Sequence, residues 1–250
     1  WPRERLDTLA RIDPEALGSN TPPDFEFFYL DITSVAEGRL ILPKRKVRFK
    51  DAPSRARQPV KPGDVLMSTV RPNLKAFACF DQTYGDYVAS TGFAVLRPKD
   101  NAASHFVYHS LFSDNVEKQI RQRVVGSNYP AINTKDVAAL LFHAPPKEDQ
   151  VAIAGILDTV DEAIRQTAAV IEKLNKIKAG LLHDLLTRGI DEGGQLRDND
   201  PSRKPVPISS FAHVNPPVDS TRLLPQTPVS FVPMEDVSEG GHWTNRLNRE

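Results

Sequence analysis

The chain has 250 residues, of which 40% are hydrophobic and 26% are charged, with 32 Lys and Arg against 32 Asp and Glu. The formal net charge of zero excludes a uniformly basic nucleic-acid binder, and the apolar content excludes a wholly disordered chain. A single cysteine excludes a disulfide framework or a Cys-ligated zinc site, and no apolar run reaches the ~18 residues of a membrane span. We therefore expect a cytoplasmic protein of one or two domains without a membrane partner, and the start at Trp1 rather than Met indicates a processed chain or a fragment.

The first part of the chain predicts a mixed α/β globule. A β-branched and apolar stretch, Val65–Val70, predicts a strand, and Ala76–Phe80 and Gly92–Leu96 predict two more. From Ser104 to about Arg123, apolar residues recur at spacings of three and four, which predicts one amphipathic helix.

Positive charge is concentrated in residues 39–75, which hold 11 basic residues against 2 acidic ones, whereas residues 1–38 hold 3 against 8. Such a density would supply several phosphate contacts if half of it faced one way. A solvated loop remains the alternative, because charge alone does not separate the two.

A long helix is the strongest prediction. Pro145 and Pro146 suit a helix start, the acidic pair Glu148 and Asp149 suits its first turn, and Arg188-Gly189 suits its end. Between them, side chains alternate at spacings of four and three, which indicates a coiled-coil seam that needs a partner helix. The apolar seam positions are Ile153, Leu157, Val160, Ile164, Ile171, Leu174, Leu181 and Leu185, with Thr167 and Lys178 as its polar members.

Beyond this helix, residues 191–207 read as a linker, and the chain then repeats features of its beginning. Ala10–Pro14 has a counterpart in Ala212–Pro216, and Tyr29–Gly38 has one in Phe231–Gly240, both at an offset of 202 residues. We expect a duplicated module that stops early in its second copy.

No catalytic constellation stands out. The sequence has no Gly-rich dinucleotide fingerprint and no phosphate loop. Asn215-Pro216-Pro217 lacks the aromatic residue that an adenine-methyltransferase tetrapeptide would place next, and His105 and His109 lack a third ligand for zinc. We therefore expect neither an enzyme nor a metal site.

Taken in order, the motifs resemble those of the specificity subunit of type I restriction-modification systems. The motifs that carry the resemblance are Phe28–Ile32 with Glu37-Gly38, Lys61–Leu66, Ser90–Pro98, Gly126-Ser127, Ala131-Ile132, Pro145–Gln150, Ile153-Ala154, Leu157-Asp158, and Gly180–Thr187.

This resemblance implies an α+β fold, in which a mixed α/β target-recognition domain is followed by a long coiled-coil-forming helix and the start of a repeated domain. The domains expected are 1–145 for recognition, 146–190 for the spacer helix, 191–207 for the linker and 208–250 for a truncated second recognition domain. Its implied role is to read one half of a bipartite double-stranded DNA target and to dock methyltransferase and restriction subunits. S-adenosylmethionine, ATP and Mg are expected on those partners and no cofactor on this chain. A half-length chain would pair as a homodimer.

Base reading requires ordered polar side chains, whereas phosphate contacts require cations. Arg71 and Arg97 are the candidate guanine readers, Asn73 and Asn128 the adenine readers, and Tyr129 a residue that packs on sugar or base. The phosphate contacts are assigned to the basic block, namely Lys44, Arg45, Lys46, Arg48, Lys50, Arg55, Arg57 and Lys75. The alternative function is a coiled-coil scaffold or adaptor without base readout.

Overall fold

The computed structural model of the chain describes residues 1–36, 38–126, 130–198, 206–210 and 212. It divides into two compact units, Trp1–Ile177 and Lys178–Glu250. The strands are β1 (Arg3–Arg5), β2 (Ala10–Ile12), β3 (Glu26–Leu30), β4 (Val35–Ala36), β5 (Arg39–Leu40), β6 (Val47–Arg48), β7 (Ala56–Val60), β8 (Asp64–Ser68), β9 (Phe77–Phe80), β10 (Tyr87–Ser90), β11 (Phe93–Pro98) and β12 (Leu141–His143). The α-helices are α1 (Leu6–Leu9), α2 (Ser104–Ser110), α3 (Asp114–Arg123), α4 (Thr134–Ala138) and α5 (Lys147–Thr187), and the 3-10 turns are η1 (Ile32–Ser34), η2 (Phe49–Asp51), η3 (Pro72–Leu74) and η4 (Ile208–Ser210).

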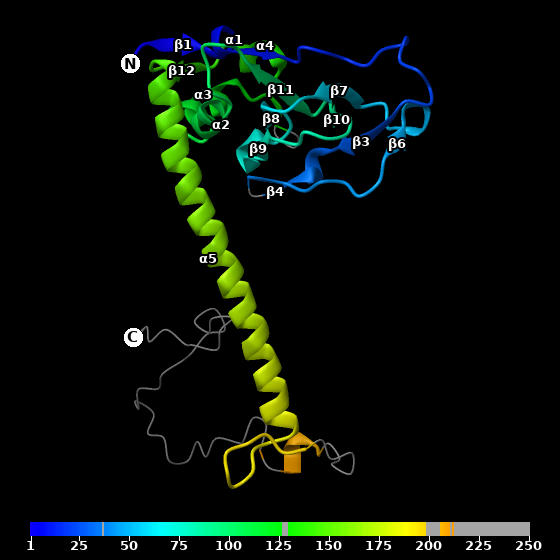
Figure 1. The fold of residues 1–250 in the computed structure, drawn as a ribbon, viewed down its shortest axis with the longest axis vertical. Coiled ribbons are helices and arrows are strands. Elements are labelled where there is room, and N and C mark those ends of the chain that lie inside the picture. Colours follow the sequence, from blue (N-terminus) through cyan, green and yellow to red (C-terminus); the bar gives the residue numbers. More distant parts are fainter. Residues whose placement is uncertain (37, 127–129, 199–205, 211, 213–250) are drawn as a thin grey trace, which may run out of the picture. The chain divides into compact units, whose positions relative to one another are not determined.

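Two four-stranded sheets form the body of the first unit (Figure 1). One has the strand order β6-β3-β10-β7, in which β3 and β10 run parallel, and the other has the order β2-β11-β8-β9 with antiparallel pairs throughout. The short pairs β1-β12 and β4-β5 complete the pairing of the named strands. Helix α2 packs against β8 and β9.

Strand β8 explains how the layers stack, because every one of its five residues is buried. Val65 and Met67 belong to the apolar cluster that includes the helices, whereas Leu66, between them, belongs to the cluster shared with the other sheet. Successive side chains of a strand point to opposite faces, so a run without polar alternation is a sheet covered on both sides. The result is an α+β fold with a helical layer, two sheets and a core on each side of β8.

The predicted strands are confirmed within two residues at each end by β8, β9 and β11. The single helix predicted from Ser104 to Arg123 is wrong, since the structure has two helices, α2 and α3. The hydroxyl of Ser113 accepts a hydrogen bond from the Val116 amide and begins α3. Apolar side chains on both helices are buried, so the periodicity continues across the break.

The long helix is confirmed as α5, whose 41 residues correspond to a length of roughly 60 Å. Glu148 and Asp149 lie in its first turn as expected, and Gly189 follows its end with a φ of 74°. The Gly189 amide donates to the Leu185 carbonyl, which closes the last turn.

In the second unit, the predicted linker begins with a short turn in which Ile190 and Leu196 pair as an antiparallel bridge. Of the expected second recognition domain, the structure describes residues 208–210, as η4, and residue 212. The rest of that expected domain lies outside the described residues.

Among the described helices, none combines the length and the apolar character needed to cross a bilayer.

Candidate nucleic-acid interface

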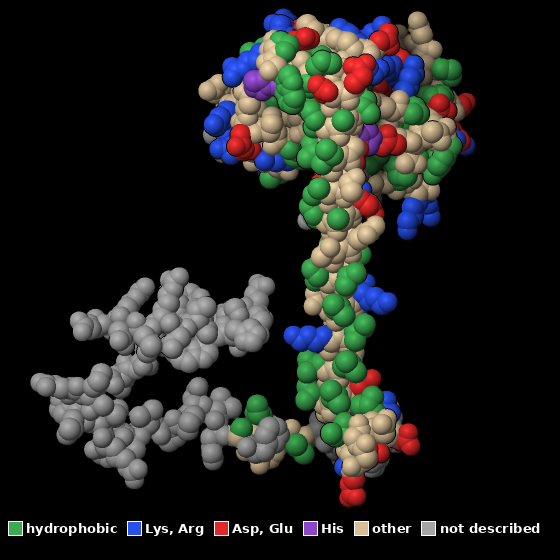
Figure 2. Space-filling model, turned by 60° about the vertical axis from the view of Figure 1, so that its left-hand side comes forward, with side chains coloured by type: hydrophobic (Ala, Val, Ile, Leu, Met, Phe, Trp, Pro, Cys, Tyr) green, Lys and Arg blue, Asp and Glu red, His purple; other side chains and the backbone are tan. Residues whose placement is uncertain are grey.

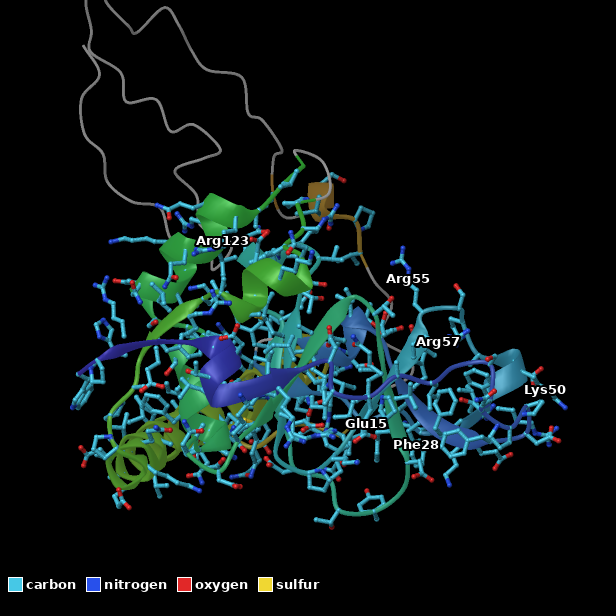
Figure 3. All side chains as sticks on the ribbon, turned by 90° about the horizontal axis from the view of Figure 1, so that it is seen from above. Glu15, Phe28, Lys50, Arg55, Arg57 and Arg123 are labelled. Atoms are coloured by element: carbon cyan, nitrogen blue, oxygen red, sulfur yellow. The ribbon has the colours of Figure 1, made fainter. Side chains whose placement is uncertain are left out.

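The basic block surrounds one end of the sheet β6-β3-β10-β7. Lys50 lies on η2, Arg55 directly precedes β7, and Arg57 lies within β7. These three residues lie at the same end of the globular part, and Arg123 of α3 lies apart from them (Figure 3). Lys44, Arg45 and Lys46 precede β6 and are exposed. The structure therefore brings most of the predicted phosphate-contacting cations to neighbouring elements.

Carboxylates from the acidic N-terminal segment neutralise part of this block. Lys50 pairs with Asp24 at 2.8 Å, Arg48 pairs with Glu26 at 3.5 Å, and Lys61 pairs with Glu15. Hydrogen bonds from Lys61 and then from Arg97 hold the pKa of Glu15 below its usual value. Since these acids come from residues 15–26, the negative and positive blocks of the sequence meet in the fold.

Two further cations lie over aromatic rings. The Lys46 ammonium is 5.6 Å from the centroid of the Phe28 ring, and the Arg57 guanidinium carbon is 4.8 Å from that of Phe49. A ring face attracts a cation without neutralising it, so these charges are oriented and still available to phosphate.

The remaining cations of this region are Lys44, Arg45 and Arg55. Within the part of the chain that the structure describes, they form no ion pair. They are exposed, and they are therefore the charges most accessible to a polyanion.

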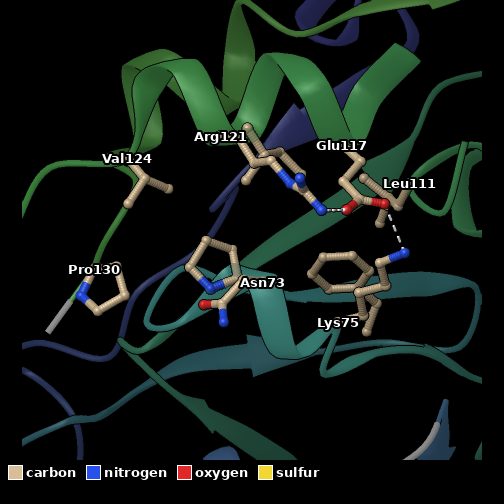
Figure 4. Close-up of a pocket in the computed structure, with 10 residues that line it drawn as sticks. Asn73, Lys75, Leu111, Glu117, Arg121, Val124 and Pro130 are labelled. Carbon is tan, nitrogen blue, oxygen red and sulfur yellow. Dashed lines mark hydrogen bonds and ion pairs between the residues drawn. The ribbon is translucent and has the colours of Figure 1, made fainter. Parts of the chain in front are cut away.

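A second group of candidates lies on the turn between β8 and β9. Arg71 and Asn73 are exposed there, and Lys75 pairs with Glu117 of α3 at 2.8 Å. Glu117 also binds Arg121 on the next turn of its own helix (Figure 4). The turn and α3 enclose a mostly apolar pocket of about 200 Å³. Its lining residues are Pro72, Asn73, Lys75, Phe77, Leu111, Glu117, Ile120, Arg121, Val124 and Pro130.

Arg97 differs from the other candidates because its guanidinium is used inside the fold. Its Nε and Nη2 each donate to Asp64 at 2.8 Å, and its Nη1 donates to Glu15. Asp64 is 1% exposed, and these hydrogen bonds, those of Asp64 first, raise the pKa of Arg97 above its usual value. This arrangement favours a structural role over base reading for Arg97.

The junction between α2 and α5 was not expected from the sequence. Asp158 of α5 accepts hydrogen bonds from His105 Nδ1 at 3.0 Å and His109 Nε2 at 2.8 Å. Gln150, 1% exposed, accepts from the Ala103 amide at 3.0 Å and donates to the Asn101 carbonyl at 3.1 Å. The four-residue spacing of the two histidines was visible in the sequence, but their shared partner lies about fifty residues away. Among the described residues, no group of three or more His, Cys, Asp or Glu side chains is arranged to hold a metal ion.

The predicted seam of α5 is exposed from Leu157 onward, and hydrophobic side chains line the helix surface (Figure 2). Ile153 is half-buried, and the buried residues of α5 are Gln150 and Ala154. The remaining apolar seam positions are exposed at Leu157, Val160, Ile164, Ile171, Leu174, Leu181 and Leu185.

Asn128 and Tyr129, predicted to contact bases, lie outside the described residues.

The family model described as "Type I restriction modification DNA specificity domain" matches residues 54–176. Among curated proteins, the chain is 30% identical over 136 residues to the type I restriction enzyme HindI specificity subunit of Haemophilus influenzae, which covers 53% of this chain and 29% of that protein. It is 29% identical over 136 residues to the putative type I restriction enzyme MjaX specificity subunit of Methanocaldococcus jannaschii, with 52% and 32% covered. The chain thus spans about a third of these relatives.

Solved structures agree with this likeness. The crystal structure of the HsdS subunit from Thermoanaerobacter tengcongensis superposes with a TM-score of 0.61 and 29% identity, covering 80% of this chain and 52% of that one. A chain from a study of complex assembly and conformational transition in the type I R-M system gives a TM-score of 0.63 with 28% identity and the same coverage.

Proposed function

Because the chain belongs to the specificity-subunit family of type I restriction-modification systems, we propose that it reads one half of a bipartite DNA target. In this proposal residues 1–145 recognise DNA, and α5 serves as a spacer and docking helix. The chain itself is non-catalytic, and it works in the cytoplasm.

One observation carries the proposal, namely the extent of the family match. The match to residues 54–176 begins just before β7 and ends within α5. It includes η3, α2 and most of α5. The same stretch holds Arg55, Arg57, Arg71 and Asn73, so these proposed recognition residues and most of α5 lie within one family domain.

The partners follow from the same proposal. A DNA methyltransferase subunit and a restriction subunit would assemble on α5 and supply S-adenosylmethionine, ATP and Mg. Pairing with a second copy of the chain is the proposed arrangement if the subunit is of half length. The exposed apolar seam supports a helical partner, because a rod of this length gains little stability unless its apolar face is covered.

The test is a selection of duplexes from a random-sequence library with the full chain, followed by competition binding between an enriched duplex and the unselected pool. We expect a preference of at least about tenfold, since a single good base contact discriminates by roughly 1–3 kcal/mol. Equal affinity for all duplexes would instead identify a scaffold without base readout, and the proposal would be abandoned.

A further inference from the structure

The turn from Arg71 to Lys75 has an unusual backbone. Arg71 has a φ of 48° and Lys75 a φ of 52°, in the left-handed region that residues other than glycine seldom adopt. In the described ranges, Asp13 is the one other non-glycine residue with positive φ. Such conformations persist where surrounding contacts determine them, and they concentrate at functional sites.

Several contacts fix the main chain of this turn. The Leu74 amide donates to the Arg71 carbonyl at 2.9 Å, and the Lys75 amide donates to the Pro72 carbonyl at 3.0 Å. The Arg71 amide donates to the Pro130 carbonyl at 2.7 Å, which ties the turn to the segment after α3. These hydrogen bonds link the main chain of the turn to itself and to the segment after α3.

The inner side of the turn is joined to α3. Pro72 is buried, and the Lys75 ammonium binds Glu117, which also binds Arg121. Hydrogen bonds from Lys75 and then Arg121 lower the pKa of Glu117, so it remains a carboxylate between two cations. Figure 4 shows this bridge among the residues that line the apolar pocket.

The outer side of the turn carries an apolar tip between polar neighbours. Leu74 is 67% exposed, although it has the character of a core residue, and Asn73 beside it is also exposed. A duplex groove offers both matching surfaces, since thymine methyl groups and sugars are apolar and adenine presents a donor and an acceptor to an amide.

Resting on the proposed function, we infer that this turn is a preformed recognition element that enters a DNA groove. Leu74 contacts thymine methyl groups or sugar faces, Asn73 hydrogen-bonds to a base edge, and Glu117 is a positioning residue that acts through Lys75. The exposed guanidinium groups of Arg71 on the turn and Arg121 on α3 favour DNA over a protein surface as the occupant, because a duplex presents a dense array of phosphates beside its grooves.

The experiment uses the full chain, the enriched duplex and the random pool, and it compares Leu74→Ala and Asn73→Ala with Ile41→Ala. Ile41 is a matched control because it is 57% exposed and lies on a different segment. We expect the two turn variants to lose about tenfold or more of the preference for the enriched duplex, while affinity for the pool changes by less than about threefold. Ile41→Ala should retain both.

Two further variants separate a structural defect from a recognition defect. Leu74→Met keeps an apolar tip and should retain the preference, and Glu117→Gln should reduce it while the thermal midpoint and the affinity for the pool stay near wild type. If the wild-type chain shows a preference and the Leu74 and Asn73 variants keep it, the inference is overturned. If the wild-type chain shows none, the proposed function itself fails.

Discussion

At the scale of single residues, carboxylates neutralise part of the positive charge of the basic block in the folded chain. Lys50, Arg48 and Lys61 already have carboxylate partners, whereas Lys44, Arg45 and Arg55 have none among the described residues. A phosphate that replaces an existing carboxylate partner gains less than one that meets an uncompensated cation. Under the proposed function, the strength of nonspecific DNA binding should therefore depend most on the second group.

Replacing Lys44, Arg45 and Arg55 together by Ala should weaken binding to every duplex. If all three contact phosphates, the slope of log K against log salt should become shallower by up to about 3, since each contact releases about 0.9 counterions. Fluorescence anisotropy titrations from low to high salt measure the slope. The control Lys173→Ala, Lys176→Ala, Lys178→Ala removes the same charge from α5 and should leave the slope unchanged, and an equal effect there would contradict the assignment.

A substitution of Arg97 tests whether this residue has a structural role or reads a base. Replacing it by Met would leave Asp64, which is 1% exposed, with a buried charge and fewer hydrogen bonds. Removing one partner of a buried ion pair costs about 3–5 kcal/mol, so we expect a fall of about 3 kcal/mol in the free energy of unfolding. Urea denaturation measures it. A stable variant with lost sequence preference would restore Arg97 as a base reader.

At the scale of elements, the contact between α2 and α5 depends on protonation. Burial lowers the pKa of His105, but the hydrogen bond and charge of Asp158, with the charge of Asp81, outweigh burial and raise it. Burial raises the pKa of Asp158, and the hydrogen bonds from His105 and His109 outweigh this and lower it. The Tyr108 ring packs against His109, with ring centroids 4.9 Å apart. Burial first, and then the charge of Asp161, raise the pKa of Tyr108 to about 12, so its hydroxyl stays neutral at physiological pH.

These shifts predict where the junction is most stable. A raised His105 pKa stabilises the fold at low pH, and this contribution is lost as pH rises through the folded-state pKa. A lowered Asp158 pKa stabilises the fold above the ordinary carboxyl range, and this is lost as pH falls. The benefit of Asp158 over Asp158→Asn should therefore be largest between roughly pH 4 and 6.5. Urea denaturation of both proteins across pH measures it, and a difference independent of pH would refute the assignment.

The elements themselves were predictable where their signals are local. The periodicity and end signals of α5 and the apolar runs of β8, β9 and β11 lie within short stretches, and the structure confirms the helix and the three strands. The break between α2 and α3 was not predicted, because it depends on a single hydroxyl cap at Ser113 within an unbroken apolar pattern. The pairings Arg97–Asp64 and His105–Asp158 span 33 and 53 positions, so a single sequence gave no signal for them. Asp13, Arg71 and Lys75 likewise have a positive φ that the sequence does not predict, because glycine is the residue that usually marks this conformation.

At the scale of the whole molecule, α5 is the surface through which the chain would join an assembly. Leu174→Asp places a charge at an exposed seam position and should abolish association with a type I methyltransferase subunit or a second copy. Size-exclusion chromatography with light scattering measures the complex. The matched control Ala169→Asp adds the same charge on the opposite side of the helix from the seam, and it should leave assembly intact. Complexes that survive Leu174→Asp would show that the seam is not the interface.

The exposed seam also has a consequence for how much of this protein a cell can hold. A helix that presents Ile164, Ile171 and Leu174 to water offers a contiguous apolar surface of the kind that chaperones and proteases recognise. Copies made in excess of their partner would be removed by quality control, whereas assembled copies would be spared. The partner's abundance would then set the steady-state level of this chain, so that unassembled copies would not accumulate.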